Sequence, residues 1–121
     1  MRITNPTALL GEDEACKYLQ KIGYRIIERN FRKRNGEVDI IALHENTLVF
    51  IEVKTRSSNQ FGEPLESIGY FKLKVLIKTA QLYKMLYPNL PENLRIDAIG
   101  IMISNDGEID KLDHVKNISG F

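Results

Sequence analysis

The chain has 121 residues, of which 43% are hydrophobic and 27% charged, a balance that is ordinary for a folded domain with one core. No stretch is long and apolar enough to span a membrane, and the first residues lack the pattern of a signal peptide. Cys16 is the one cysteine, which excludes an internal disulfide. We therefore expect a single cytoplasmic domain over residues 1–121, with no membrane partner.

The net charge of +1 conceals an uneven distribution of charge along the chain. Residues 1–84 carry 14 Lys/Arg and 10 Asp/Glu, whereas residues 85–121 carry 3 and 6. A solvated strand edge would explain a basic run, because lysines and arginines lie on most protein surfaces. The position of the densest run directly before an acidic cluster favours nucleic-acid binding instead. That run consists of Arg25, Arg29, Arg32, Lys33 and Arg34, with Glu28 among them.

The first half of the chain predicts one helix and three strands. Apolar residues recur at helical spacing over residues 7–22, with Thr7 as the candidate N-cap and Gly23 suited to the C-terminal end. The elements that follow are a strand at 24–31, a polar turn at 32–36, and a hairpin of strands 37–43 and 47–55.

The second half predicts a loop, a helix and two strands. Pro64 begins a short helical turn, and prolines end the long helix that precedes the last strands. The order of elements predicts an α/β domain with one mixed five-stranded sheet flanked by helices. The expected elements are a loop at 56–63, a helix at 70–86, a strand at 94–103, a turn at 105–107 and a strand at 108–115.

The hairpin brings charged residues together. If its turn is centred on residues 45–46, the residue numbers of each cross-strand pair sum to 91. Asp39 then lies opposite Glu52, and Glu37 lies opposite Lys54. Strict alternation leaves the other face of the hairpin wholly apolar. That face consists of Val38, Ile40, Ala42, Val49, Ile51 and Val53.

Two opposed carboxylates repel each other, and a bound cation removes that penalty. Hard divalent cations prefer oxygen ligands, so Asp39 and Glu52 predict a metal site. A Glu37–Lys54 ion pair with two exposed acids would explain the same charges without a metal. Glu12 favours the metal, because it lies on the apolar stripe of the first helix, where a carboxylate needs a partner. The helix dipole explains an acid near the helix start, but not its choice of the core-facing position.

These residues resemble the PD-(D/E)xK nuclease superfamily, in which an Asp precedes (Asp/Glu)-x-Lys on the next strand. Here the motif reads Val38-Asp39 and Glu52-Val53-Lys54, with valine in place of the usual proline. Glu12 stands eleven residues before Gly23-Tyr24, which is similar to the archaeal Holliday-junction resolvases.

The chain is identified as a member of the YraN-like UPF0102 family, and the resemblance covers nearly its whole length. The matching segments are Gly11-Glu12-x-x-Ala15, Asn30-Phe31-Arg32, Gly36-Glu37-Val38-Asp39-Ile40-Ile41-Ala42, Phe50-Ile51-Glu52-Val53-Lys54-Thr55-Arg56, Phe61-Gly62-x-Pro64, Lys72, Arg95-Ile96-Asp97 and His114-Val115-Lys116-Asn117.

The resemblance implies a restriction-endonuclease-like fold and Mg²⁺- or Mn²⁺-dependent hydrolysis of phosphodiester bonds in DNA, for which branched repair or recombination intermediates are candidate substrates. It implies that Asp39, Glu52 and the Val53 carbonyl bind the metal, with Glu12 completing the shell directly or through water. Lys54 would orient or deprotonate the attacking water.

Substrate binding would come from basic side chains that contact phosphates without reading sequence. A solvated face explains Lys74 and Lys78 better, and Arg95 with Asp97 predicts an internal ion pair. We expect DNA as the partner, although RNA fits the same residues. Dimerisation, as in the resolvases, would extend the reach of so small a domain. The alternatives are a non-catalytic nucleic-acid-binding module with this fold and an adaptor whose acidic pocket only holds a structural metal. The candidate phosphate-binding residues are Arg29, Arg32, Lys33, Arg34, Arg56 and Lys72.

Overall fold

A computed structural model describes residues 5–34, 36–57 and 62–120 of the chain. The predicted order of helices and strands is confirmed. No helix within these ranges is long and apolar enough to cross a membrane. The elements are α1 (Pro6–Lys21), β1 (Arg25–Lys33), β2 (Gly36–His44), β3 (Thr47–Ser57), the 3₁₀ helix η1 (Pro64–Ser67), α2 (Tyr70–Leu86), β4 (Asn93–Ile103) and β5 (Ile109–Val115).

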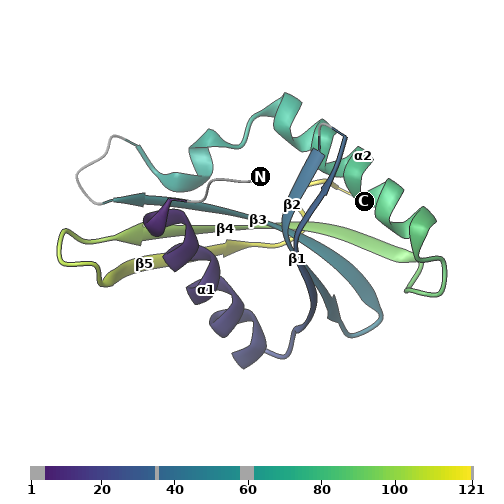
Figure 1. The fold of residues 1–121 in the computed structure, drawn as a ribbon, viewed down its shortest axis with the longest axis horizontal. Helices are drawn as coiled ribbons and strands as arrows, with labels where there is room; N and C mark the ends of the chain where they lie inside the picture. Colours follow the sequence, from purple (N-terminus) through teal and green to yellow (C-terminus); the bar gives the residue numbers. More distant parts are fainter. Residues whose placement is uncertain (1–4, 35, 58–61, 121) are drawn as a thin grey trace.

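The strands form one mixed sheet in the order β1-β2-β3-β4-β5. β3 and β4 are parallel because η1 and α2 cross over between them, and the other neighbouring pairs are antiparallel. α1 and α2 cover opposite faces of the sheet (Figure 1). This arrangement confirms the predicted α/β class and is consistent with a restriction-endonuclease-like fold.

The sheet buries a separate apolar cluster on each face. The cluster under α1 includes Ala15, Cys16 and Leu19 of the helix and branched residues of β2, β3 and β4. The cluster under α2 includes Leu76, Ala80 and Tyr83 with residues of β1 to β4. A sheet covered on both sides explains the long runs of buried residues in β2, β3 and β4.

Several predicted boundaries are wrong by a few residues. The polar turn expected at 32–36 is shorter, because β1 continues to Lys33 and β2 begins at Gly36. β3 continues to Ser57, and residues 58–61 of the predicted loop lie outside the described part of the chain. Asn5 rather than Thr7 caps α1, since its Oδ1 accepts from the Ala8 amide at 2.7 Å. Gly23 has the left-handed φ of 96° expected after a helix end.

The β2–β3 hairpin forks where the acidic residues begin. The predicted register is confirmed from His44↔Thr47 to Ile40↔Ile51, the last pair of the ladder. Beyond it β2 stays paired with β1, while β3 stays paired with β4 as far as Ser57. Figure 1 shows the β1–β2 hairpin leaving the plane of the other strands and reaching α2.

The fork overturns one prediction about the faces of the hairpin. Strict alternation places Val38 on the face of Ile40, but Val38 lies in the α2-side cluster with Phe31, whereas Ile40 lies in the α1-side cluster. Asn30 of β1, between the partners of Val38 and Ile40, adopts a left-handed φ of 55°. The alternation is therefore interrupted at Asp39, where the strand turns towards α2.

Candidate functional site: an acidic cluster at a strand fork

Three of the acids that the sequence predicts as site residues are buried. Glu12 is 4% exposed, Asp39 9% and Glu52 2%. A buried carboxylate is costly unless it is paired, hydrogen-bonded or bound to a metal. These side chains come from α1, β2 and β3, so the fold, and not the local sequence, brings them to one place.

Asp39 lies in the gap that opens when β2 separates from β3. Its Oδ2 accepts a hydrogen bond from the Val53 amide at 2.8 Å, a bond that holds the carboxylate against β3. Burial, the nearby charge of Glu52 and, less strongly, that of Glu12 raise the pKa of Asp39 well above its usual range, against the lowering effect of the Val53 amide. A hydrogen bond between the Asp39 and Glu52 carboxyls acts in the same direction. The two acids therefore converge as predicted, although they are not a ladder pair.

Glu52 is held by two lysines. Its Oε2 lies 3.3 Å from Lys54 Nζ and 3.4 Å from Lys72 Nζ. Lys54 follows Glu52 by two residues on the same face of β3, whereas Lys72 comes from the first turn of α2. Lys72, predicted only as a phosphate contact, thus lies inside the acidic cluster. Glu37, predicted opposite Lys54, forms a 3.2 Å ion pair with Arg32, its neighbour on β1.

Glu12 reaches the cluster because α1 packs very closely on β3. Gly11 lies over Thr55, and a Cβ added at Gly11 would be 1.9 Å from Thr55 Oγ1 and 2.9 Å from Thr55 Cβ. Only glycine allows this approach, which sets the next residue, Glu12, beside the fork. Arg29 Nη2 lies 3.7 Å from Glu12 Oε1 and 3.0 Å from Asp13 Oδ1, so it joins β1 to the helix.

Gly11→Ala should lower the free energy of unfolding by about 1–3 kcal/mol, the usual cost of inserting a methyl group into a packed contact. Alanine stabilises a helix by about 0.5–1 kcal/mol relative to glycine, so the protein is destabilised only if the clash with Thr55 costs more than this gain. Urea denaturation of the two proteins measures the difference.

Thr55→Ala in the Gly11→Ala background should recover part of the loss, because it removes Oγ1 and Cγ2 and leaves Cβ. Gly69→Ala is the control, since a methyl group there meets no atom within 4 Å. A Gly11→Ala protein as stable as the original would show that α1 does not need this close approach.

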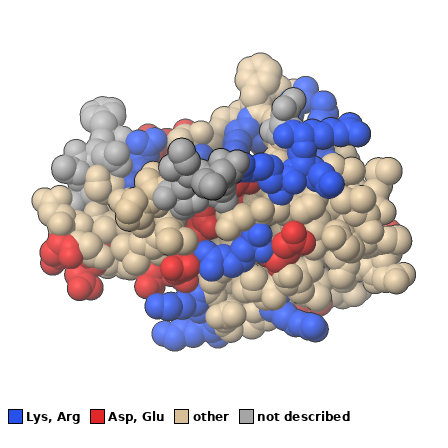
Figure 2. Space-filling view, viewed as in Figure 1, with Lys and Arg blue, Asp and Glu red and all other residues tan. Residues whose placement is uncertain are grey.

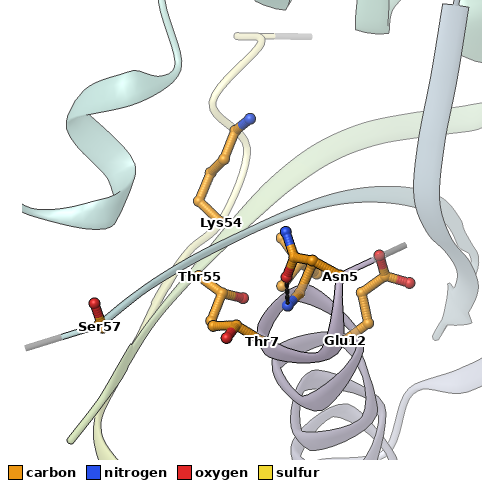
Figure 3. A pocket seen from close by; sticks show the side chains of 8 residues that line it. Asn5, Thr7, Glu12, Lys54, Thr55 and Ser57 are labelled. Carbon is orange, nitrogen blue, oxygen red and sulfur yellow. Dashed lines mark hydrogen bonds between the residues drawn. The ribbon is translucent and has the colours of Figure 1, made fainter. Parts of the chain in front are cut away.

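A cavity of about 400 Å³ opens beside the acidic cluster, between the start of α1 and β3. Figure 3 shows Lys54 and Thr55 leaving β3 in opposite directions, with Thr55 towards α1. The cavity could admit a hydrated ion or part of a phosphate group at the edge of the cluster. Its walls are Asn5, Thr7, Ala8, Glu12, Val53, Lys54, Thr55 and Ser57.

The predicted phosphate-binding residues fall into different environments. Lys33 and Arg34 are exposed at the end of the β1–β2 hairpin, next to Arg32, and Arg56 is half-buried on β3. Gly36 packs on Thr79 of α2, which brings this hairpin beside the helix. Figure 2 shows Lys and Arg gathered at the upper right of the view, where Figure 1 places α2 and the hairpin end. Arg29, by contrast, holds the carboxylates of α1.

The site offers a metal two carboxylate ligands rather than a complete set of protein ligands. Among residues 5–34, 36–57 and 62–120, no three Asp, Glu, His or Cys side chains are already grouped as metal ligands. Glu12 is close enough to influence Asp39 electrostatically. The part of Val53 that the structure places at the cluster is its amide, and the metal-binding role of its carbonyl stays a prediction.

Fold and site together define an α/β protein with a buried acid pair and two lysines at a strand fork. The chain belongs to the family described as uncharacterised protein family UPF0102, whose model matches residues 11–101. A UPF0102 protein of Desulforamulus reducens is 42% identical over 109 residues, which cover 88% of this chain and 89% of that relative. One of Chlorobium phaeobacteroides is 45% identical over 111 residues, with 88% of each chain covered. The family name carries no activity, so the function is inferred from the site.

Proposed function

We propose that the protein is a Mg²⁺- or Mn²⁺-dependent endonuclease that hydrolyses phosphodiester bonds in DNA, acting in the cytoplasm on repair or recombination intermediates. The observation that carries the proposal is the burial of Asp39 and Glu52, which are 9% and 2% exposed, with Lys54 Nζ 3.3 Å from Glu52 Oε2. The same residues carry the resemblance to the PD-(D/E)xK nucleases. A purely structural pair of acids would gain nothing from burial beside each other.

The donor set fits a hard divalent cation. Asp39 and Glu52 supply carboxylate oxygens, and a cation between them would offset the repulsion by which Glu52 raises the pKa of Asp39. Glu12 would complete the shell through water, and the Val53 carbonyl is the further ligand we propose. When bound, the metal lowers the pKa of a water molecule and stabilises negative charge on the phosphate.

The protein's own residues position the reaction. Glu52 holds Lys54 at the edge of the cluster, where the ammonium group can orient the attacking water and offset the charge of the phosphate. Hydrolysis forms one bond from the water oxygen to phosphorus and breaks the bond to the leaving sugar oxygen, which takes up a proton. Lys72, 3.4 Å from the same Glu52 oxygen, adds a second positive charge beside the phosphate.

Cleavage of branched, single-stranded and duplex DNA in Mg²⁺ or Mn²⁺ tests this proposal. Asp39→Ala and Lys54→Ala should each reduce the rate by on the order of 10²–10⁴-fold, the usual effect of removing a catalytic acid, base or charge-stabilising group. EDTA should abolish cleavage by the unaltered protein. Asp110→Ala, which removes an exposed acid from β5, is the matched control and should cleave normally.

The outcomes separate the candidate functions. DNA binding without cleavage by the unaltered protein would overturn the enzyme and favour a non-catalytic binding module. Absence of both binding and cleavage would favour an adaptor. The presence of Glu12, Asp39, Glu52 and Lys54 together, three of them buried, argues against a decayed site.

A further inference from the structure

Two large aromatic side chains are exposed at the start of α2. Tyr70 is 69% and Phe71 is 80% exposed, and their ring centroids lie 5.6 Å apart at an angle of 73°. Neither ring belongs to the clusters that cover the two faces of the sheet. Exposure of two neighbouring rings forfeits the stabilisation that burial would give. These rings therefore fit binding of another molecule better than stabilisation of the fold.

A lysine lies over one of the rings. Lys74 Nζ lies 5.3 Å from the centre of the Tyr70 ring, and Lys78 is exposed one turn further along the helix. We call Tyr70, Phe71, Lys74 and Lys78 the α2 aromatic surface. The β1–β2 hairpin reaches the sheet-facing side of the same helix, where Gly36 packs on Thr79, and its exposed basic end adds positive charge near α2 (Figure 2).

The first turn of α2 carries both the rings and a side chain of the candidate active site. Lys72 follows Phe71 directly and lies 3.4 Å from Glu52 Oε2. Consecutive helix residues point about 100° apart, so a strand bound to the rings would extend around this turn to reach the phosphate that the site is proposed to cleave. A polymer with flat bases and phosphates matches exposed rings with lysines on the same helix, because aromatic side chains stack on bases and lysines attract the phosphates.

We propose that the α2 aromatic surface binds the unpaired bases of single-stranded DNA, and that the substrate of the nuclease is DNA with an unpaired segment beside the cleaved bond. Only the statement about the cleaved substrate depends on the proposed nuclease function. Duplex DNA keeps its bases stacked inside the helix and offers the rings only its backbone. The site thus prefers a strand that is already single or has been opened at a branch.

Fluorescence anisotropy with a labelled oligo-dT of about 12 nucleotides tests the proposal in EDTA, so that binding is measured without cleavage. Phe71→Ala should weaken binding on the order of 5- to 150-fold, the range for loss of a stacked base. Phe71→Trp should retain binding, and Phe71→Leu should not. Affinity for blunt duplex DNA should change less than about twofold, since its bases remain inside the helix.

Met85→Ala is the matched control, because Met85 is 77% exposed at the other end of the same helix. Equal oligo-dT binding by the Phe71→Ala and unaltered proteins overturns the proposal, even if the protein cleaves DNA. If oligo-dT binding depends on Phe71 but the unaltered protein does not cleave DNA, base binding by the α2 aromatic surface is supported and the proposed nuclease activity is overturned. Loss of a dimer, or of binding to anionic vesicles, with unchanged oligo-dT binding would assign the rings to a second copy or a membrane and overturn the proposal.

Discussion

Asp97→Ala should lower the free energy of unfolding by about 3–5 kcal/mol, the usual cost of removing one partner from a buried ion pair. This loss is a large part of the total stability of a small domain, about 5–15 kcal/mol. The side chain of Asp97 is completely buried on β4, under α1. Sequence alone predicts its ion pair with Arg95, and the structure confirms that pair at 2.8 Å.

The reason for so large an effect is that Asp97 satisfies donors from four other residues. Its Oδ1 accepts from Arg95 Nε at 2.8 Å and from the Asn117 amide at 3.0 Å. Its Oδ2 accepts from the Tyr24 hydroxyl at 3.1 Å, from Arg95 Nη2 at 3.2 Å and from His114 Nε2 at 2.8 Å. Alanine would leave each of these donors without its acceptor in the protein interior.

The same contacts orient the ring of His114. Because the Asp97 carboxylate accepts, His114 donates to it through Nε2, and the other ring nitrogen, Nδ1, lies 2.9 Å from the Tyr18 hydroxyl. Asp97 thus joins α1, β4, β5 and the segment after β5 through hydrogen bonds that apolar packing cannot replace. Burial alone would raise the pKa of Asp97, but hydrogen bonds from His114 and Arg95 lower it to about 2.

Thermal and urea denaturation measure the loss, and Asp110→Ala is the control because Asp110 is exposed on β5. Since the pKa of Asp97 is lower in the folded protein, its contribution is present above the unfolded value of about 3.9 and disappears as the pH falls towards about 2. The unaltered protein should therefore lose stability over that acid range, and Asp97→Ala much less. A difference below about 1 kcal/mol at neutral pH, the cost of a single ordinary hydrogen bond, would contradict this account.

The register of the β2–β3 hairpin was predictable because a short turn fixes the pairing of both strands. Strict alternation failed at Val38, since nothing local signals that β2 leaves β3 to pack on α2. The fork depends on two close approaches between distant segments, Gly11 on Thr55 and Gly36 on Thr79. A glycine in the sequence does not tell which neighbour it admits.

Glu12 was predictable for a different reason. A carboxylate on the apolar stripe of a helix is a conflict that one sequence displays by itself. The contact of Lys72 with Glu52 was not predictable from the sequence, because it depends on where the crossover between β3 and β4 places the start of α2. The exposure of Phe71, by contrast, follows from the helical period, because Leu73, Leu76 and Ala80 define the buried stripe of α2 and Phe71 points away from it.

Asp39→Asn should stabilise the metal-free protein at slightly alkaline pH by about 0.5–2 kcal/mol, as stabilising changes at functional sites commonly do. Asparagine keeps an oxygen for the Val53 amide and removes the negative charge that faces Glu52. The pKa of Asp39 is raised in the folded protein, chiefly by burial and then by Glu52. Its contribution to stability is therefore complete below the unfolded value of about 3.9 and is lost as the pH rises through the folded value.

Urea denaturation in EDTA at about pH 5 and about pH 8 measures the effect, because the folded and unfolded proteins bind different numbers of protons between these values. The advantage of Asp39→Asn should grow with pH, and Asp110→Asn should show no such trend. Mg²⁺ should stabilise the unaltered protein more at the higher pH, since a cation replaces the proton between Asp39 and Glu52, and it should stabilise Asp39→Asn much less. An equal effect of Mg²⁺ on both proteins would mean that these two carboxylates do not bind it, and that their burial beside each other needs another explanation.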